Sequence, residues 1–73
     1  MDEKEIISRI SENIRLQRYR KHITQENLAE QVNISTKYMN LIENKKANPT
    51  ITIIVKICEV LNLSLEKLLK DNN

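Results

Sequence analysis

The sequence predicts an all-α fold: one domain over residues 1–73, built as a compact bundle of five short helices. Three observations support this class. Glycine is absent and proline occurs once, so few residues interrupt helices. Aromatic residues, which are enriched in β-strands, make up only 3% of the chain. Apolar residues recur at the three- and four-residue spacing of a helix face, and Ser or Thr, the preferred N-cap residues, precede several of these stretches.

The first helix is expected over residues 3–20. Ile7, Ile10 and Ile14 follow the i, i+3, i+7 spacing of one buried stripe. Acidic residues gather at its start and basic residues at its end, which suits the helix dipole. Because no glycine is available to end this helix, Lys21 and His22 must form its exit.

Two short helices follow, over residues 25–32 and 36–43. Thr24 and Ser35 are their N-caps, and Asn33 suits the left-handed backbone that often follows a helix. The inward-facing residues are Leu28, Ala29, Val32, Met39 and Ile42. A turn of about four residues makes the two helices cross steeply, so that the second can be presented outward on the first, as in a helix-turn-helix. Many helical hairpins share this spacing.

The last two helices are expected over residues 51–61 and 65–70. The predicted stripe of the first consists of Ile51, Ile54, Ile57, Cys58 and Leu61, and the apolar face of the second of Leu65, Leu68 and Leu69. Ile53, Val55 and Val60 lie elsewhere on the first of these helices, which therefore carries more apolar surface than one stripe needs. Residues 71–73 are expected to be a frayed tail.

The charge is unevenly distributed. The segment from Arg15 to Lys46 holds seven basic and three acidic residues, whereas the rest of the chain holds five basic and seven acidic residues. Such a segment can form a patch that attracts phosphate. An ordinary solvated helical surface is the other interpretation of these charges.

The sequence argues against several classes of protein. No apolar run approaches the length of a transmembrane helix, and the acidic start does not resemble a signal peptide, so we expect a cytoplasmic protein without a membrane partner. Cys58 is the only cysteine and is expected to be a small buried hydrophobic residue.

His22 is the only histidine, and no cysteine or carboxylate cluster lies near it, so neither a metal site nor a catalytic dyad can be built around it. No glycine-rich loop is present to bind phosphates. We therefore expect no enzyme, no cofactor and no metal, and no small-molecule ligand is apparent.

Three segments carry a specific resemblance: residues 23–35, residues 42–49 and residues 57–69. Their residues and spacing resemble the Xre/Cro family of helix-turn-helix regulators, to which the lambdoid phage repressors belong, over about residues 14–69. The resemblance implies a lambda-repressor-like bundle in which the second and third helices form the helix-turn-helix. It also implies a bacterial or phage regulator that binds double-stranded operator DNA, usually as a dimer, and lies at the nucleoid when bound. Activation and repression are both compatible with it.

The resemblance places the base-reading residues on the third helix: Thr36, Lys37, Asn40 and Leu41. Lys37 can donate to guanine O6 and N7, and Thr36 can donate, accept or touch a thymine methyl group. Leu41 stands where family members often carry a polar base reader. It could pack on thymine methyl groups, point into the core or simply be left exposed.

The resemblance and the side-chain chemistry also give a set of phosphate-binding residues: Arg18, Gln25, Ser35, Tyr38, Asn44, Lys45 and Lys46. In the family the residue matching Gln25 bonds a phosphate and supports the recognition helix. Tyr38 could send its hydroxyl to a phosphate or pack its ring against the fourth helix. Arg18 and Glu43 match positions that form an ion pair between the first and third helices.

The family often has glycine where this chain has His22, Asn33 and Lys45. Asn33 tolerates a left-handed backbone, whereas His22 tolerates it less and Lys45 least. The sequence therefore does not determine the backbone conformation of these loops.

A homodimer is expected, because one copy of the motif contacts too few base pairs to select a site. Val60, Leu63 and Leu65 are the expected dimer contact, although Leu63 and Leu65 could instead complete a small core. The alternative function is an antitoxin or anti-regulator that uses the same fold mainly to bind a protein partner.

Overall fold

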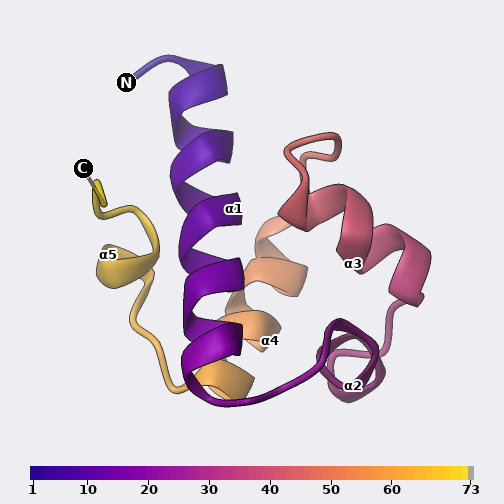
Figure 1. Cartoon of the computed structure of the whole chain (residues 1–73). Helices are drawn as coiled ribbons and strands as arrows, with labels where there is room; N and C mark the ends of the chain where they lie inside the picture. The colour runs from indigo at the N-terminus through magenta and orange to yellow at the C-terminus, as the bar shows by residue number, and fades with distance from the viewer. Residues whose placement is uncertain (73) are drawn as a thin grey trace.

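Five helices follow one another in the structure, a computed structural model that describes residues 1–72 (Figure 1). They are α1 (Glu3–Arg20), α2 (Gln25–Gln31), α3 (Thr36–Glu43), α4 (Ile51–Leu61) and α5 (Leu65–Leu68). No strand occurs in this part of the chain. The predicted all-α class is therefore confirmed.

Two helices end earlier than predicted. α2 stops at Gln31 rather than residue 32, because Val32 leaves helical geometry as the chain enters the left-handed turn at Asn33. α5 stops at Leu68 rather than residue 70. The carbonyl groups of Leu68, Leu69 and Lys70, at and just beyond its end, accept hydrogen bonds from side chains of α1.

Every helix begins with a side-chain cap. The side chain of the N-cap residue accepts from the backbone N–H three residues later, at distances of 2.8–3.3 Å. The capping residues are Asp2, Thr24, Ser35, Thr50 and Ser64. Each cap of this kind typically stabilises its helix by about 1 kcal/mol. The caps thus fix where each short helix starts.

Four helix exits use the left-handed backbone without glycine. The φ angles are 56° at His22, 61° at Asn33, 64° at Lys45 and 51° at Asn62. Three of these, His22, Asn33 and Lys45, are positions where the family that the sequence resembles often has glycine. The loops therefore keep the glycine-type shape with side chains that tolerate it less well.

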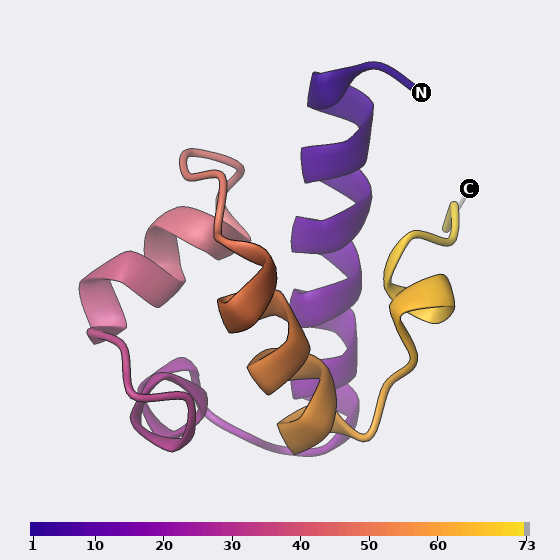
Figure 2. The same ribbon diagram turned by 180° about the vertical axis from the view of Figure 1, so that it is seen from behind.

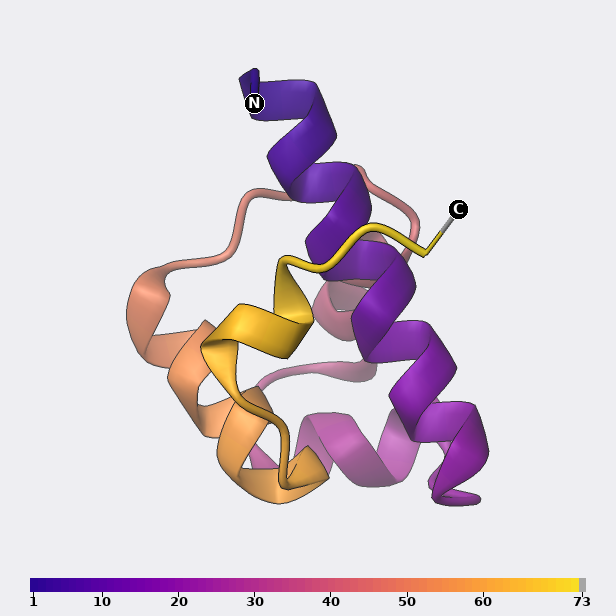
Figure 3. The same ribbon diagram turned by 90° about the vertical axis from the view of Figure 1, so that its left-hand side faces the viewer.

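The core lies where α1, α4 and the helix-turn-helix pair meet. Its buried members are Ile14, Leu28, Ala29, Val32, Met39, Ile42, Ile54, Ile57, Cys58, Leu61 and Leu68. Seen from behind, α4 lies nearest the viewer, with α1 on one side and the α2–α3 pair on the other, and it contacts α1 and α2 (Figure 2). α5 packs against both α1 and α4 (Figure 3). Cys58 takes the predicted place in the core.

The prediction for Ile51 is wrong. This residue is 63% exposed, although its spacing places it in the buried stripe of α4. It is the first residue of the helix, and Ile53 from the same turn packs against the core with Ala47 of the preceding loop. Val55 and Leu65 are also exposed, so α4 and α5 together present apolar side chains to solvent.

The prediction of a frayed tail is wrong for Asp71 and Asn72, and Asn73 lies outside the described residues. The buried Asn13 Nδ2 donates to the carbonyls of Leu68 at 2.7 Å and Lys70 at 2.9 Å, and Asn13 Oδ1 accepts from Asn72 Nδ2 at 2.7 Å. An ion pair of 3.7 Å joins Arg9 to Asp71. Polar side chains of α1 thus hold the C-terminal segment.

The helices of residues 1–72 include none with both the length and the apolar character needed to cross a membrane.

Candidate nucleic-acid interface

The turn between α2 and α3 is held by its own backbone. Asn33 N–H donates to the Glu30 carbonyl at 3.1 Å, and Ile34 N–H donates to the Ala29 carbonyl at 3.0 Å. The Ile34 side chain packs against the core, while Ser35 caps α3. The angle at which α3 leaves α2 is therefore set by several independent contacts.

α3 presents its N-terminal half to solvent. Ser35, Thr36 and Lys37 are exposed, whereas Met39 and Ile42 are fully buried and attach the opposite face to the core. Within residues 1–72, no carboxylate lies at ion-pair distance from the Lys37 ammonium group. Thr36 and Lys37 are thus free to contact a ligand that lies along this face.

The other predicted members of the site on α3 are less exposed or already bonded. Tyr38 is partly buried against the core, and Leu41 is half-buried. Asn40 is exposed, but its Nδ2 donates to Gln25 Oε1 at 3.2 Å. The resemblance implied that Gln25 supports the third helix, but sequence reasoning did not identify Asn40, fifteen positions away, as its partner.

Arg18 and Glu43 form an ion pair that joins α1 to α3. Arg18 Nε donates to Glu43 Oε2 and Arg18 Nη2 to Glu43 Oε1, both at 2.9 Å. Arg18 Nη1 donates to the Ile23 carbonyl at 3.0 Å, which adds the loop before α2. The side chain of Glu43 is 2% exposed and that of Arg18 is 11% exposed. The hydrogen bond to Glu43, the largest influence, raises the pKa of Arg18 above its ordinary value.

The loop after α3 carries the remaining predicted phosphate contacts. Asn44 Nδ2 folds back onto the Asn40 carbonyl at 2.9 Å, and Lys45 Nζ lies 3.5 Å from Glu12 Oε1. The Lys46 side chain is exposed, while its backbone N–H is bonded to the Leu41 carbonyl at 2.9 Å. Lys46 is therefore the lysine of this loop with the freer side chain.

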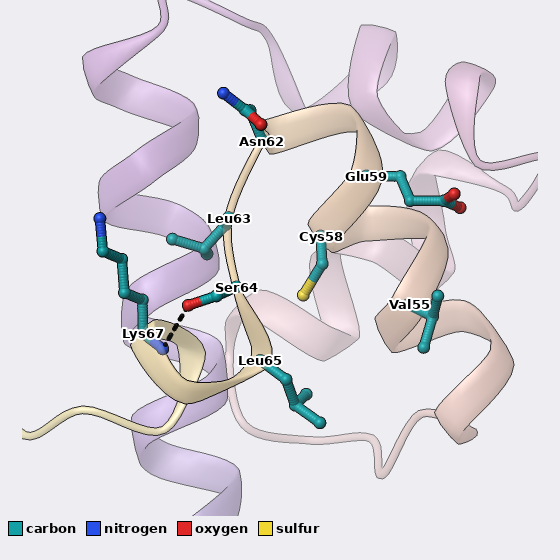
Figure 4. A pocket seen from close by; sticks show the side chains of 8 residues that line it. All are labelled: Val55, Cys58, Glu59, Asn62, Leu63, Ser64, Leu65 and Lys67. Atoms are coloured by element: carbon teal, nitrogen blue, oxygen red, sulfur yellow. Dashed lines mark hydrogen bonds between the residues drawn. The ribbon is translucent and has the colours of Figure 1, made fainter.

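The three residues predicted for a dimer contact differ in their exposure to solvent. Val60 and Leu63 are partly buried against the core, and Leu63 points towards α1 (Figure 4). Leu65 is 45% exposed and borders an open hollow between α4 and α5, with Val55 at its other side. Cys58 also lines this hollow, and burial raises the pKa of its thiol. Residues 1–72 contain no group of three His, Cys, Asp or Glu side chains placed to hold a metal ion.

Comparison with known proteins yields matches over most of the chain. The profile of the helix-turn-helix family matches residues 14–68. Among curated proteins, Control protein C.SmaI of Serratia marcescens is 36% identical over 69 residues, which are 94% of this chain and 79% of the relative.

Two solved structures are similar to this chain in fold. The hypothetical transcription factor NHTF from Neisseria has a TM-score of 0.88 and 30% identity, over 97% of this chain and 80% of that one. The clp gene regulator ClgR from Corynebacterium glutamicum has a TM-score of 0.84 and 22% identity, over 88% of this chain and 68% of that one, and shows the shared fold.

Proposed function

Because this chain belongs to the helix-turn-helix family and is a DNA-binding protein of the transcription-regulator type, we propose that it binds a two-fold symmetric operator as a dimer. In this proposal α3 lies in the major groove of each half-site. The observation that carries it is the exposed N-terminal half of α3, held at a fixed angle by the turn and by the Arg18–Glu43 pair. The relatives are regulators, so the chain is not an enzyme.

Thr36 and Lys37 are the proposed base readers. The N-terminal residues of a recognition helix are the ones that contact base edges, and both side chains are exposed there. Lys37 suits guanine, and Thr36 can bond a base or touch a thymine methyl group. Leu41, half-buried one turn further on, is the proposed apolar contact to thymine.

Phosphate contacts flank this helix on both sides. They are assigned to Arg18, Gln25, Ser35, Tyr38, Asn44, Lys45 and Lys46. Lys46 is best placed among them because its ammonium group is exposed at the end of α3. Arg18 already uses Nε, Nη1 and Nη2 within the fold, so its phosphate contact depends on the N–H groups that these bonds leave over. Such contacts fix the register of the protein on the duplex without reading its sequence.

The proposed dimer contact is centred on Leu65 and Val55 rather than on Val60 and Leu63. The first two are exposed, whereas the last two already pack against the core and support this face from behind. Lys56 and Glu59 border the same part of α4, beside Val55. A two-fold contact between such faces can bring opposite charges together.

The alternative of a module that mainly binds a protein partner is less well supported. The named relatives are a control protein and a transcription factor. In the proposed dimer, the exposed apolar residues of α4 and α5 face a second copy of the chain.

Selection of bound duplexes from a random library, near physiological salt, tests the proposal. We expect enrichment of a two-fold symmetric site whose half-sites are centred about 34–36 Å apart. Weak binding that salt abolishes, without any enriched sequence, would refute the proposal of a stand-alone operator-binding regulator.

A further inference from the structure

The hydrogen bond between Asn40 and Gln25 changes the role expected for Asn40. The sequence places Asn40 among the base readers. In the structure its Nδ2 donates to Gln25 Oε1 at 3.2 Å, so the amide is directed towards α2. A further bond of 2.9 Å from Asn44 Nδ2 to the Asn40 carbonyl ties the backbone at this point.

Bonding to Asn40 fixes which end of the Gln25 amide faces α3. A glutamine amide has an accepting oxygen and a donating NH₂ group, and it can turn either end towards a partner. Because Asn40 donates, Gln25 must offer Oε1 to it. Nε2 is therefore the end of the Gln25 amide that is left to donate to an acceptor outside the protein.

The bond to Gln25 also argues against base reading by Asn40. Asparagine recognises adenine with the oxygen and the nitrogen of its amide together, both aimed into the groove. The Asn40 nitrogen is instead bonded to Gln25.

We infer that Asn40 is a positioning residue that orients the Gln25 amide to donate to a backbone phosphate, and that it does not read a base. This inference rests on the proposed binding of duplex DNA with α3 in the major groove. Asn40 then helps to form a phosphate contact, which sets the register of the protein on the duplex. Three predicted base readers, Thr36, Lys37 and Leu41, remain to determine the operator sequence.

A double-mutant cycle on the selected duplex tests the inference. Dissociation constants are measured for the wild-type protein, Gln25→Ala, Asn40→Ala and the double variant. We expect each single substitution to weaken binding about five-fold, the size of one net hydrogen bond. The double variant should bind no more weakly than Gln25→Ala, because Asn40 acts only through Gln25.

Two further readouts separate positioning from a general structural effect. Asn40→Ala should leave the selected base sequence unchanged, and both single variants should lose interference by ethylation at the same phosphate of each half-site. Gln31→Ala is the matched control: it removes an exposed amide hydrogen bond, to Asn27, at the other end of α2 and should change neither affinity nor footprint. Unfolding temperatures of all variants establish that each is folded.

Additive effects in the cycle, or a changed base preference in Asn40→Ala, would overturn the inference while leaving the proposed function intact. Failure of the wild-type protein to select any duplex would overturn both.

Discussion

Arg18 joins three parts of the molecule through one side chain. Its planar guanidinium bonds both oxygens of Glu43 on α3 and the Ile23 carbonyl before α2. Lysine could not make this set of bonds, because an ammonium group lacks the flat fork that matches a carboxylate. The pair therefore orients α3 relative to α1 as well as neutralising two nearly buried charges.

Replacing Glu43 with Gln should destabilise the fold strongly. The substitution leaves the Arg18 charge in a nearly buried place without its anion, and loss of one partner of such a pair typically costs about 3 kcal/mol or more. Urea unfolding measures the free energy. The control is Glu12→Gln, which breaks the exposed pair with Lys45 and should change stability by less than about 1 kcal/mol. Equal effects of the two substitutions would contradict this account of the Arg18–Glu43 pair.

Lys37 and Lys46 should differ in how their replacement affects DNA binding. Lys37→Ala removes a base reader, so discrimination at one base pair of each half-site should fall by about 1–3 kcal/mol. Lys46→Ala should weaken all sequences alike and lower the salt slope by about 0.9 for each phosphate that is no longer neutralised. Titrations against the operator and its single-base variants at several salt concentrations measure both effects. Reduced discrimination in Lys46→Ala, but not in Lys37→Ala, would reverse the assignment.

At the scale of the helices, the non-glycine residues with positive φ at the helix exits hold the backbone in a strained conformation. Substitution with glycine can relieve this strain. His22 has a φ of 56°, and its replacement with Gly should raise the free energy of unfolding by about 1 kcal/mol because glycine adopts this backbone freely. Thermal and urea unfolding measure the gain. Lys21→Gly is the control: Lys21 has a φ of −92°, so glycine relieves nothing there and should not stabilise. A gain at Lys21 equal to that at His22 would show that strain is not the cause.

The helices themselves were predictable because their signals are local. Thr24, Ser35 and Ser64 mark helix starts within one turn, and the apolar stripes repeat every three or four residues. The periodicity also explains the error at Ile51. A stripe shows which side of a helix faces inward, but it does not show how far along the helix the neighbouring elements reach.

Local sequence patterns could not predict contacts between residues that are far apart in the chain. The Asn13 side chain donates to the Leu68 carbonyl, 55 positions away, and no sequence pattern near either residue predicts this hydrogen bond. The same holds for Asn40 and Gln25, which the resemblance separated into a base reader and a phosphate-binding residue. Arg18 and Glu43 were paired in advance only because the resemblance supplied the partner.

For the whole molecule, the exposed apolar face of α4 and α5 should control assembly. Val55→Glu and Leu65→Glu place charges on this face without entering the core, so the variants should remain folded but sediment as monomers and lose most of their affinity for the full operator. Lys4→Glu is the control, since Lys4 is exposed in the first turn of α1 and a new carboxylate there should leave the dimer intact. Sedimentation velocity distinguishes the outcomes. Val55→Glu and Leu65→Glu variants that remain dimeric would place the dimer interface elsewhere.

A crystal structure of the protein with its selected duplex tests the central claim most directly. The account predicts two copies related by a two-fold axis, each with α3 in the major groove and with Thr36 and Lys37 at hydrogen-bonding distance from base edges. The two α3 helices should be centred about 34–36 Å apart along the duplex. A complex in which α3 faces solvent while another helix enters the groove, or in which a single copy covers the selected site, would contradict the account.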